Sequence, residues 1–76
     1  MLKERAITLS SAQIDVLERI ERHTENGIHP RAYWFNIATV RVLVRKKLIT
    51  EPHYTVSMGS VTELTEKGAE WLKNRR

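Results

Sequence analysis

The stretch Asn36-Ile37-Ala38-Thr39-Val40-Arg41-Val42-Leu43-Val44-Arg45-Lys46-Lys47-Leu48-Ile49 decides how this chain folds. Asn36 is a strong N-cap residue, so the stretch predicts a helix from Ile37 to about Lys47. On a helical wheel the apolar and the basic side chains separate. The apolar side holds Ile37, Val40, Leu43 and Val44, and the opposite side holds Ala38, Arg41, Val42 and Arg45, with Thr39 and Lys46 at its margins. We therefore expect a helix that packs through one face and shows a basic face to solvent.

This helix lies in a block of the chain that has no carboxylate. Residues 26–50 hold five basic and no acidic side chains, whereas residues 1–25 hold five acidic side chains and residues 51–70 hold four. The whole chain has a formal net charge of +4 and a pI near 9.9. The segregation predicts a positive sector on the folded surface, and chance segregation along a solvated helix face is the alternative.

Length and composition limit the classes of protein to consider. The 76 residues contain 41% hydrophobic and 29% charged side chains, which predicts one small globular domain over residues 1–76. The chain has no cysteine, which excludes disulfides and thiolate metal sites. No apolar run is long enough to span a membrane, and charges in residues 1–5 stand where a signal peptide would become apolar. We expect a soluble, cytoplasmic protein that has no metal, cofactor or membrane partner.

Two further helices are expected before Asn36. The first runs from Ser11 to about residue 24, because Ser10 and Gln13 have the spacing of a capping box and Asn26-Gly27 supplies a left-handed stop. The second is short, covers about residues 30–35 and begins at Pro30, which suits the first helical position. Its aromatic residues cannot all face inward. Trp34 and Phe35 are expected to anchor the core, and Tyr33 to remain at the surface.

After Ile49 the pattern becomes that of a β-hairpin followed by a helix. The arms are residues 51–56 and 61–64, with a turn over residues 57–60. Pairing should begin after Pro52 or leave that residue at an edge, because proline has no N–H to donate. Thr65 is placed to cap the last helix. The resulting order is helix, short extended piece, helix, helix, strand, strand, helix, which is an α+β fold.

This order resembles the winged-helix variety of helix-turn-helix domain. Residues 9–13 with Val16-Leu17 resemble the opening helix of MarR- and PadR-type regulators, and residues 39–49 resemble their recognition helix and its exit. Residues 64–72 look like the L-T-E-x-G step that follows their wing, so the resemblance covers roughly residues 9–72. Small winged-helix products of phage and mobile-element genomes are also similar. The resemblance implies a three-helix core, a two-stranded hairpin wing and a C-terminal helix.

The chain departs from this family in two places. Lys47 stands where the family usually has glycine, at a left-handed residue that ends the recognition helix. A lysine there costs on the order of 1 kcal/mol or forces a different exit from the helix. The wing tip, residues 57–60, has no Arg or Lys, and the wing offers His53 and several hydroxyl groups instead.

The resemblance and the basic face imply sequence-specific binding of double-stranded DNA by a small transcriptional regulator. The helix over about residues 36–47 would enter the major groove, which is about 12 Å wide. Arg41 and Arg45 are the main expected contacts, to guanine or to phosphate. Thr39 suits a base edge or a phosphate, and Ala38 and Val42 suit thymine methyl groups. The complete set of expected DNA-contacting residues is Arg31, Asn36, Ala38, Thr39, Arg41, Val42, Arg45, Lys46 and His53.

The remaining contacts in this set are to the DNA backbone. The start of the helix near Asn36 offers free N–H groups to a phosphate oxygen. Lys46 and Arg31 are expected to bind phosphate, and His53 on the wing arm is a further phosphate contact. If about five cations bind phosphates, log K should fall with log salt at a slope near −4 to −5.

A homodimer on a pseudo-palindromic site is expected, because so small a monomer covers little DNA. Leu2, Ile7 and Trp71 are the candidate interface residues, and the favoured alternative for Trp71 is that it covers the monomer's own core. The alternative function is a winged-helix module that binds proteins and not DNA.

No enzyme is expected. His23, His29 and His53 lack the spacing of a zinc motif, and the chain has no Gly-rich phosphate loop or nucleophile elbow. Each histidine is expected to be structural or solvent-exposed.

Overall fold

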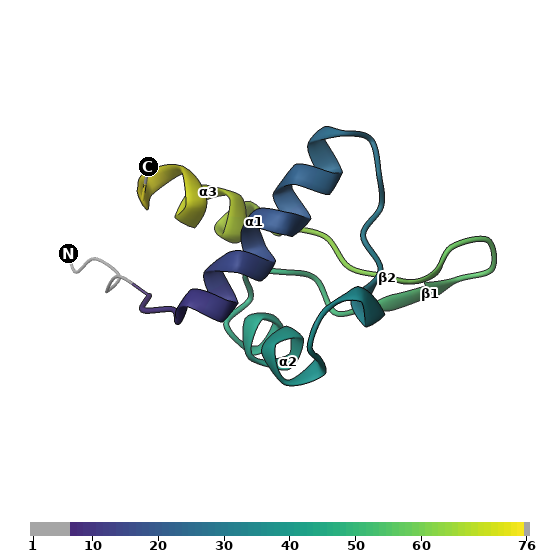
Figure 1. Ribbon diagram of the computed structural model, residues 1–76, viewed down its shortest axis with the longest axis horizontal. Coiled ribbons are helices and arrows are strands. Elements are labelled where there is room, and N and C mark those ends of the chain that lie inside the picture. The colour runs from purple at the N-terminus through teal and green to yellow at the C-terminus, as the bar shows by residue number, and fades with distance from the viewer. Residues whose placement is uncertain (1–6, 76) are drawn as a thin grey trace.

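A computed structural model describes residues 7–75 of the chain (Figure 1). These residues form a small α+β fold with three α-helices, one 3₁₀ turn and a two-stranded antiparallel hairpin. The elements in chain order are α1 (Ser11–Glu25), η1 (Ala32–Trp34), α2 (Ile37–Arg45), β1 (His53–Thr55), β2 (Gly59–Val61) and α3 (Glu66–Arg75). The predicted α+β class is confirmed.

Side-chain caps fix where each helix begins. Ser10 and Gln13 form the expected capping box at the start of α1, with Gln13 Oε1 accepting from the Ser10 N–H at 2.9 Å. Asn36 Oδ1 accepts from two N–H groups in the first turn of α2. Thr65 Oγ1 accepts from the Gly68 N–H at 3.0 Å and caps α3 as expected. All three starts are therefore encoded by residues next to the helix.

The core lies where α1 passes between α2 and α3, as Figure 1 shows. The buried apolar residues of this cluster come from all three helices and from the segment after α2. They are Val16, Leu17, Ile20, Val40, Leu43, Leu48, Ile49 and Leu72. The hairpin projects from the end of the molecule opposite α3.

The short helix predicted over residues 30–35 is reduced to the η1 turn. Pro30 and Arg31 are extended, because the Thr62 N–H donates to the Pro30 carbonyl at 3.1 Å and Arg31 forms an antiparallel bridge with Val61. These pairings hold the backbone in a strand-like conformation, so a helical turn begins only at Ala32. Val61 also pairs with His53 and thus links the two extended segments.

The aromatic residues of η1 were predicted only in part. Phe35 packs partly buried against the core, and Tyr33 is 71% exposed, both as expected. Trp34 is 44% exposed and does not anchor the core. Its ring lies against the His23 ring, with centroids 5.1 Å apart, and under the Arg31 guanidinium, 5.4 Å from the ring centroid. The difference arises because the 3₁₀ turn directs Trp34 toward the last turn of α1.

Helix α2 ends two residues earlier than the sequence predicts, in a hydrogen-bonded turn. Lys47 adopts the left-handed conformation, with φ 65°. Its N–H donates to the Val44 carbonyl at 2.9 Å, and the Leu48 N–H donates to the Leu43 carbonyl at 3.0 Å. This is the Schellman arrangement, with buried Leu43 and Leu48 at its two hydrophobic positions. Lys47 therefore occupies the left-handed position that the resemblance to winged-helix domains implied.

The second strand of the hairpin begins two residues earlier than expected. Pairing begins at His53, directly after Pro52, as predicted, but β2 begins at Gly59 and not at Val61. The turn consists of residues 56–58, and Gly59 has φ 78°. A glycine in this conformation after a short turn is typical of a bulged hairpin, which lets the second strand start inside the expected turn.

Hydrogen bonds and close packing join the segment after α2 to the segment that leads into α3 and to the first turn of α3. We call residues 47–50 and 62–68 together the seam. The Thr65 Oγ1 donates to the Lys47 carbonyl at 2.7 Å, and the Thr62 Oγ1 donates to the Thr50 carbonyl at 2.8 Å. A methyl group added to Gly68 would lie 2.0 Å from the Leu48 carbonyl oxygen. The seam therefore holds the end of α2 against α3 with no room for a larger side chain.

Candidate nucleic-acid interface

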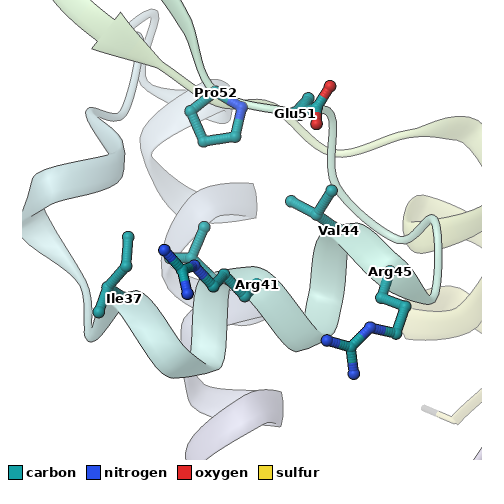
Figure 2. A pocket seen from close by; sticks show the side chains of 7 residues that line it. Ile37, Arg41, Val44, Arg45, Glu51 and Pro52 are labelled. Atoms are coloured by element: carbon teal, nitrogen blue, oxygen red, sulfur yellow. The ribbon is translucent and has the colours of Figure 1, made fainter.

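The outer face of α2 carries two arginines that have no partner. Arg41 and Arg45 are exposed (Figure 2), and neither forms an ion pair or hydrogen bond with another residue in the part of the chain that the structure describes. Four residues of helix separate them, so both lie on the same side of α2. The expectation that they project together into solvent, unburied and unpaired, is confirmed.

Two arginines on the other helices are paired with carboxylates. The Arg19 Nε is 2.8 Å from Asp15 Oδ2 within α1, and an Arg75 guanidinium nitrogen is 2.9 Å from Glu18 Oε2 between α3 and α1. The carboxylates of residues 1–25 thus neutralise cations on α1 and α3. Because residues 26–50 contain no carboxylate, α2 has no such neighbour within its own segment.

Ile37 belongs to this outer face, contrary to the prediction from the helical wheel. It is 60% exposed, whereas Val40 is 1% exposed and Leu43 is fully buried. The helix has only nine residues, and α1 packs against the side that carries Val40 and Leu43. The first residue of α2 lies beyond that contact. The result is a large apolar side chain on the same face as the two arginines.

A hollow of about 380 Å³ lies between α2 and the segment that leads into β1. It is lined by Ile37, Val40, Arg41, Val44, Arg45, Glu51 and Pro52. Figure 2 shows Pro52 and Val44 facing each other across it, and Arg41 extending over its opening on the Ile37 side. The Arg45 guanidinium points away from Glu51 in the same view. The hollow therefore has apolar walls with one cation at its mouth.

The first turn of α2 is already hydrogen-bonded by its own cap. The Asn36 side chain accepts from the Ala38 N–H at 2.9 Å and from the Thr39 N–H at 3.3 Å. Two of the N–H groups expected to be free for a phosphate are thus occupied. Ala38 is exposed and Thr39 is half-buried, where it lines a shallow hollow shared with α1.

The remaining predicted residues of α2 differ in exposure. Val42 and Lys46 are half-buried, and Lys47 is exposed. Val42 therefore offers less apolar surface than the wheel suggested. Lys46 and Lys47 follow Arg45 directly, so the C-terminal end of α2 and its turn carry three consecutive cations.

Arg31 and His53 lie at the hairpin and not on α2. The Arg31 Nε donates to the Met58 carbonyl at 2.7 Å, and a second guanidinium nitrogen donates to the His29 carbonyl. Arg31 thus ties η1 to the turn of the hairpin. His53 is exposed on β1, opposite Val61. The structure brings together the α2 residues of the predicted set and leaves these two apart from them.

The hairpin presents apolar side chains to solvent. Tyr54 is 73% exposed and Val56 is 94% exposed. No lysine or arginine occurs from residue 48 to residue 66. The hairpin therefore lacks the cations that the basic outer face of α2 has.

Two of the three residues expected at a dimer interface, Ile7 and Trp71, lie within the part of the chain that the structure describes. Leu2 is outside the described residues. The Trp71 Nε1 donates to the Ile7 carbonyl at 3.0 Å, and both side chains pack partly buried against the core. Trp71 and Ile7 are thus in contact within one chain.

Residues 7–75 contain neither a metal-binding cluster nor a helix that could span a membrane. No group of three or more histidine or acidic side chains in that range could hold a metal ion. No helix in the same range combines the length and the apolar character that a membrane span requires.

Sequence reasoning did not place three of the residues that line the hollow beside α2. Ile37 was assigned to the core, and Glu51 and Pro52 were assigned only to the hairpin arm. No local pattern would have found the last two, because their place beside α2 depends on the path of the chain through the seam.

The chain matches no protein-family model, and no curated protein or solved structure shows significant similarity to it.

Proposed function

We propose that this chain is a small winged-helix protein that binds double-stranded DNA and regulates transcription. The observation that carries the proposal is the pair Arg41 and Arg45, which are exposed on one face of α2 and have no ionic partner among residues 7–75. Unpaired arginines on an accessible helix face suit the major groove, where their forked donors match guanine and phosphate oxygens.

The arrangement of the elements supports this assignment. Under this proposal, the three helices of a helix-turn-helix core correspond to α1, η1 and α2. The hairpin corresponds to the wing. The bridge between Arg31 and Val61 adds a minimal third extended segment beside β2. Helix α2 is then the recognition helix, because it combines an apolar inner face with an outer face on which both arginines are unpaired within residues 7–75.

The contacts follow from positions along α2. In helix-turn-helix complexes the N-terminal residues of the recognition helix meet base edges. Arg41, in the middle of α2, is placed to take guanine O6 and N7 with both arms of its guanidinium. Arg45 and the lysines that follow it are placed at the helix end for phosphate contacts, which set position and affinity but not sequence.

Lys47 supports the proposal independently of the arginines. A non-glycine residue in the left-handed region is unfavourable by roughly 1–2 kcal/mol, and glycine would fit there without that strain. Strained residues concentrate at functional sites. A lysine at this place adds a fourth cation next to Arg45 and Lys46, which is useful if the surface binds a polyanion.

The first experiment is a titration of duplex DNA at several salt concentrations. With the three cations Arg45, Lys46 and Lys47 on phosphates, the slope of log K against log salt should be about −2.7. Arg41→Gln and Arg45→Gln should each weaken binding and, where the contact is to phosphate, reduce that slope by about 1. Their unfolding free energies should change by less than about 0.5 kcal/mol, because both side chains are exposed.

The matched control is Lys73→Gln. Lys73 is exposed on α3, which lies on the opposite side of α1 from α2. The variant removes the same charge and should leave the slope almost unchanged. Equal losses for all three variants would reduce the effect to net charge, and absence of duplex binding at about 50 mM salt would reject the proposal.

Selection of bound duplexes from a random pool tests whether binding depends on sequence. Enrichment of an inverted repeat would support both specific recognition and a dimer, since half-site symmetry reflects protein symmetry. An unenriched pool would contradict sequence-specific regulation.

The second candidate function is binding to another protein through the hairpin. The observation that favours it is the hairpin surface without lysine or arginine, on which Tyr54 is 73% exposed and Val56 is 94% exposed, because exposed apolar patches mark interaction sites. Among residues 7–75, its outer strand β1 pairs with β2 alone, so the other edge of β1 is open to a partner strand. Tyr54→Ser should abolish such an interaction and leave duplex binding intact.

A further inference from the structure

We propose that the hollow beside α2 receives the C5-methyl groups of thymine, and that Ile37 is the residue that distinguishes thymine from other bases. This inference rests on the proposed binding of duplex DNA. It names a base preference that neither the basic face nor the helix cap specifies.

The position of Ile37 is the first step. It is the first residue of α2, the end that meets base edges when a recognition helix enters the major groove. At 60% exposure it is the one exposed large apolar side chain on α2 within residues 7–75. Thymine is the base that shows a methyl group in the major groove, so an exposed apolar side chain there selects it.

The walls of the hollow are the second step. Beside Ile37, the Val44 and Pro52 side chains face each other across a space of about 380 Å³. A methyl group is small compared with this volume and can enter beside Ile37 without rearrangement. Apolar contact with a methyl group removes its surface from water, which is favourable in proportion to the area covered.

Charge is the third step. Arg41 extends over the mouth of the hollow, whereas the carboxylate of Glu51 lies on its far side. A carboxylate there repels a phosphate group, so the far side of the hollow disfavours the DNA backbone. An uncharged base edge is compatible with both groups. The charges therefore favour an uncharged base edge over a phosphate group inside the hollow.

The spacing of Ile37 and Arg41 adds a testable register. Four residues of helix correspond to about 6 Å along the axis, and successive base pairs lie about 3.4 Å apart. Ile37 and Arg41 therefore reach bases about two steps apart. A bound site should contain thymine about two positions from guanine.

Ile37 replaces the residues that the sequence suggested for methyl contact. Ala38 is exposed but has a single side-chain carbon, and Val42 is half-buried on the margin away from the hollow. Neither lines the hollow. The assignment of the methyl contact to Ile37 thus depends on the tertiary structure.

The test compares two synthetic duplexes that differ only in the methyl group. Alternating dA-dT polymer and alternating dA-dU polymer present the same hydrogen-bonding groups, and only the first has C5-methyl groups. The unaltered protein should bind the dA-dT duplex about fourfold more tightly for each methyl group it contacts. Ile37→Ala should bind both duplexes with nearly equal affinity.

Val56→Ala is the matched control, because Val56 is a branched residue that is 94% exposed at the hairpin turn. It should keep the preference for the dA-dT duplex. Circular dichroism of each variant establishes that the helices are intact. A control that lost the preference would place the methyl contact on the hairpin and overturn the inference.

Three other results would also overturn it. Equal binding of both duplexes by the unaltered protein would remove methyl recognition, while duplex binding itself would stand. An undiminished preference in Ile37→Ala would assign recognition to another residue. Failure to bind any duplex at low salt would reject the proposed function itself, which the first two results do not.

Discussion

Helices α1 and α2 end in the same hydrogen-bonded turn but with different residues at its left-handed position. At the end of α1 this residue is Gly27, with φ 76°, and the Ile28 N–H donates to the His23 carbonyl at 2.8 Å. At the end of α2 it is Lys47, with φ 65°. Gly27 has no atom near the place of a Cβ, whereas Lys47 leads into the seam.

The two helix ends differ in what stabilises the left-handed residue: the backbone freedom of glycine at the end of α1, and tertiary contacts at the end of α2. The end of α1 lies in open solvent, and glycine there satisfies the backbone alone. The end of α2 is held by the seam, through the Thr65 Oγ1 that donates to the Lys47 carbonyl. Packing of this kind can maintain a residue in an unfavourable conformation. We infer that the seam supplies the stability that lets α2 keep a lysine at its basic end.

The largest expected effect is that of Gly68→Ala. A Cβ at Gly68 would lie 2.0 Å from the Leu48 carbonyl oxygen, so the start of α3 must move away from residues 47–50. We expect a loss of about 3 kcal/mol or more in the free energy of unfolding, measured by urea denaturation. A loss below about 1 kcal/mol would show that the seam yields easily and does not hold the end of α2.

Thr62→Val is expected to have a smaller effect in the same region. Thr62 is fully buried, and its hydroxyl donates to the Thr50 carbonyl at 2.8 Å. Valine has a similar shape but leaves that carbonyl without its donor, which costs about 1–2 kcal/mol. The exposed Thr8 supplies the control, because Thr8→Val should change the urea midpoint very little. Equal effects of the two variants would contradict a role of this hydrogen bond in the seam.

Gly27→Ala tests the open helix end. The new methyl group meets no other atom, but alanine is strained at φ 76°. We expect a loss of about 1 kcal/mol, due to the backbone conformation alone. Comparison with Gly68→Ala then separates backbone strain from steric overlap. A loss as large as that of Gly68→Ala would show that the two glycines do not differ in this way.

Lys47→Gly should have the smallest effect on stability, and one of opposite sign. Relief of the left-handed strain, reduced by the greater freedom of glycine in the unfolded chain, should add about 0.5 kcal/mol. The same variant should bind duplex DNA more weakly, with a salt slope smaller by about 1. Lys47→Arg keeps the charge and should change neither quantity. A stabilised Lys47→Gly with unchanged binding would leave the lysine without a function in DNA binding.

The sequence predicted the parts of the fold that depend on neighbouring residues. The caps at Ser10, Asn36 and Thr65 form as expected, because each is closed by atoms within three residues along the chain. The start of pairing after Pro52 is equally local. Side-chain direction was less predictable, because Ile37 and Trp34 are apolar and a wheel or a composition argument places them inside.

The candidate interface was predicted to a similar extent. The exposure of Arg41 and Arg45 follows from helical spacing in a block without carboxylates. The engagement of Arg31 with the Met58 carbonyl, 27 residues away, could not be predicted. Nothing in the local sequence indicates that distant contact.

What the sequence by itself determined is local: where the helices start and which face of α2 is basic. Hydrogen bonds within one turn and the period of the helix are sufficient for these, since both act over a few residues. Tertiary structure alone decided that Ile37 is exposed, that Pro52 and Glu51 close a hollow beside it, and that the seam holds Lys47. These features arise where segments far apart in the chain exclude one another from the same space, and local spacing does not carry that information.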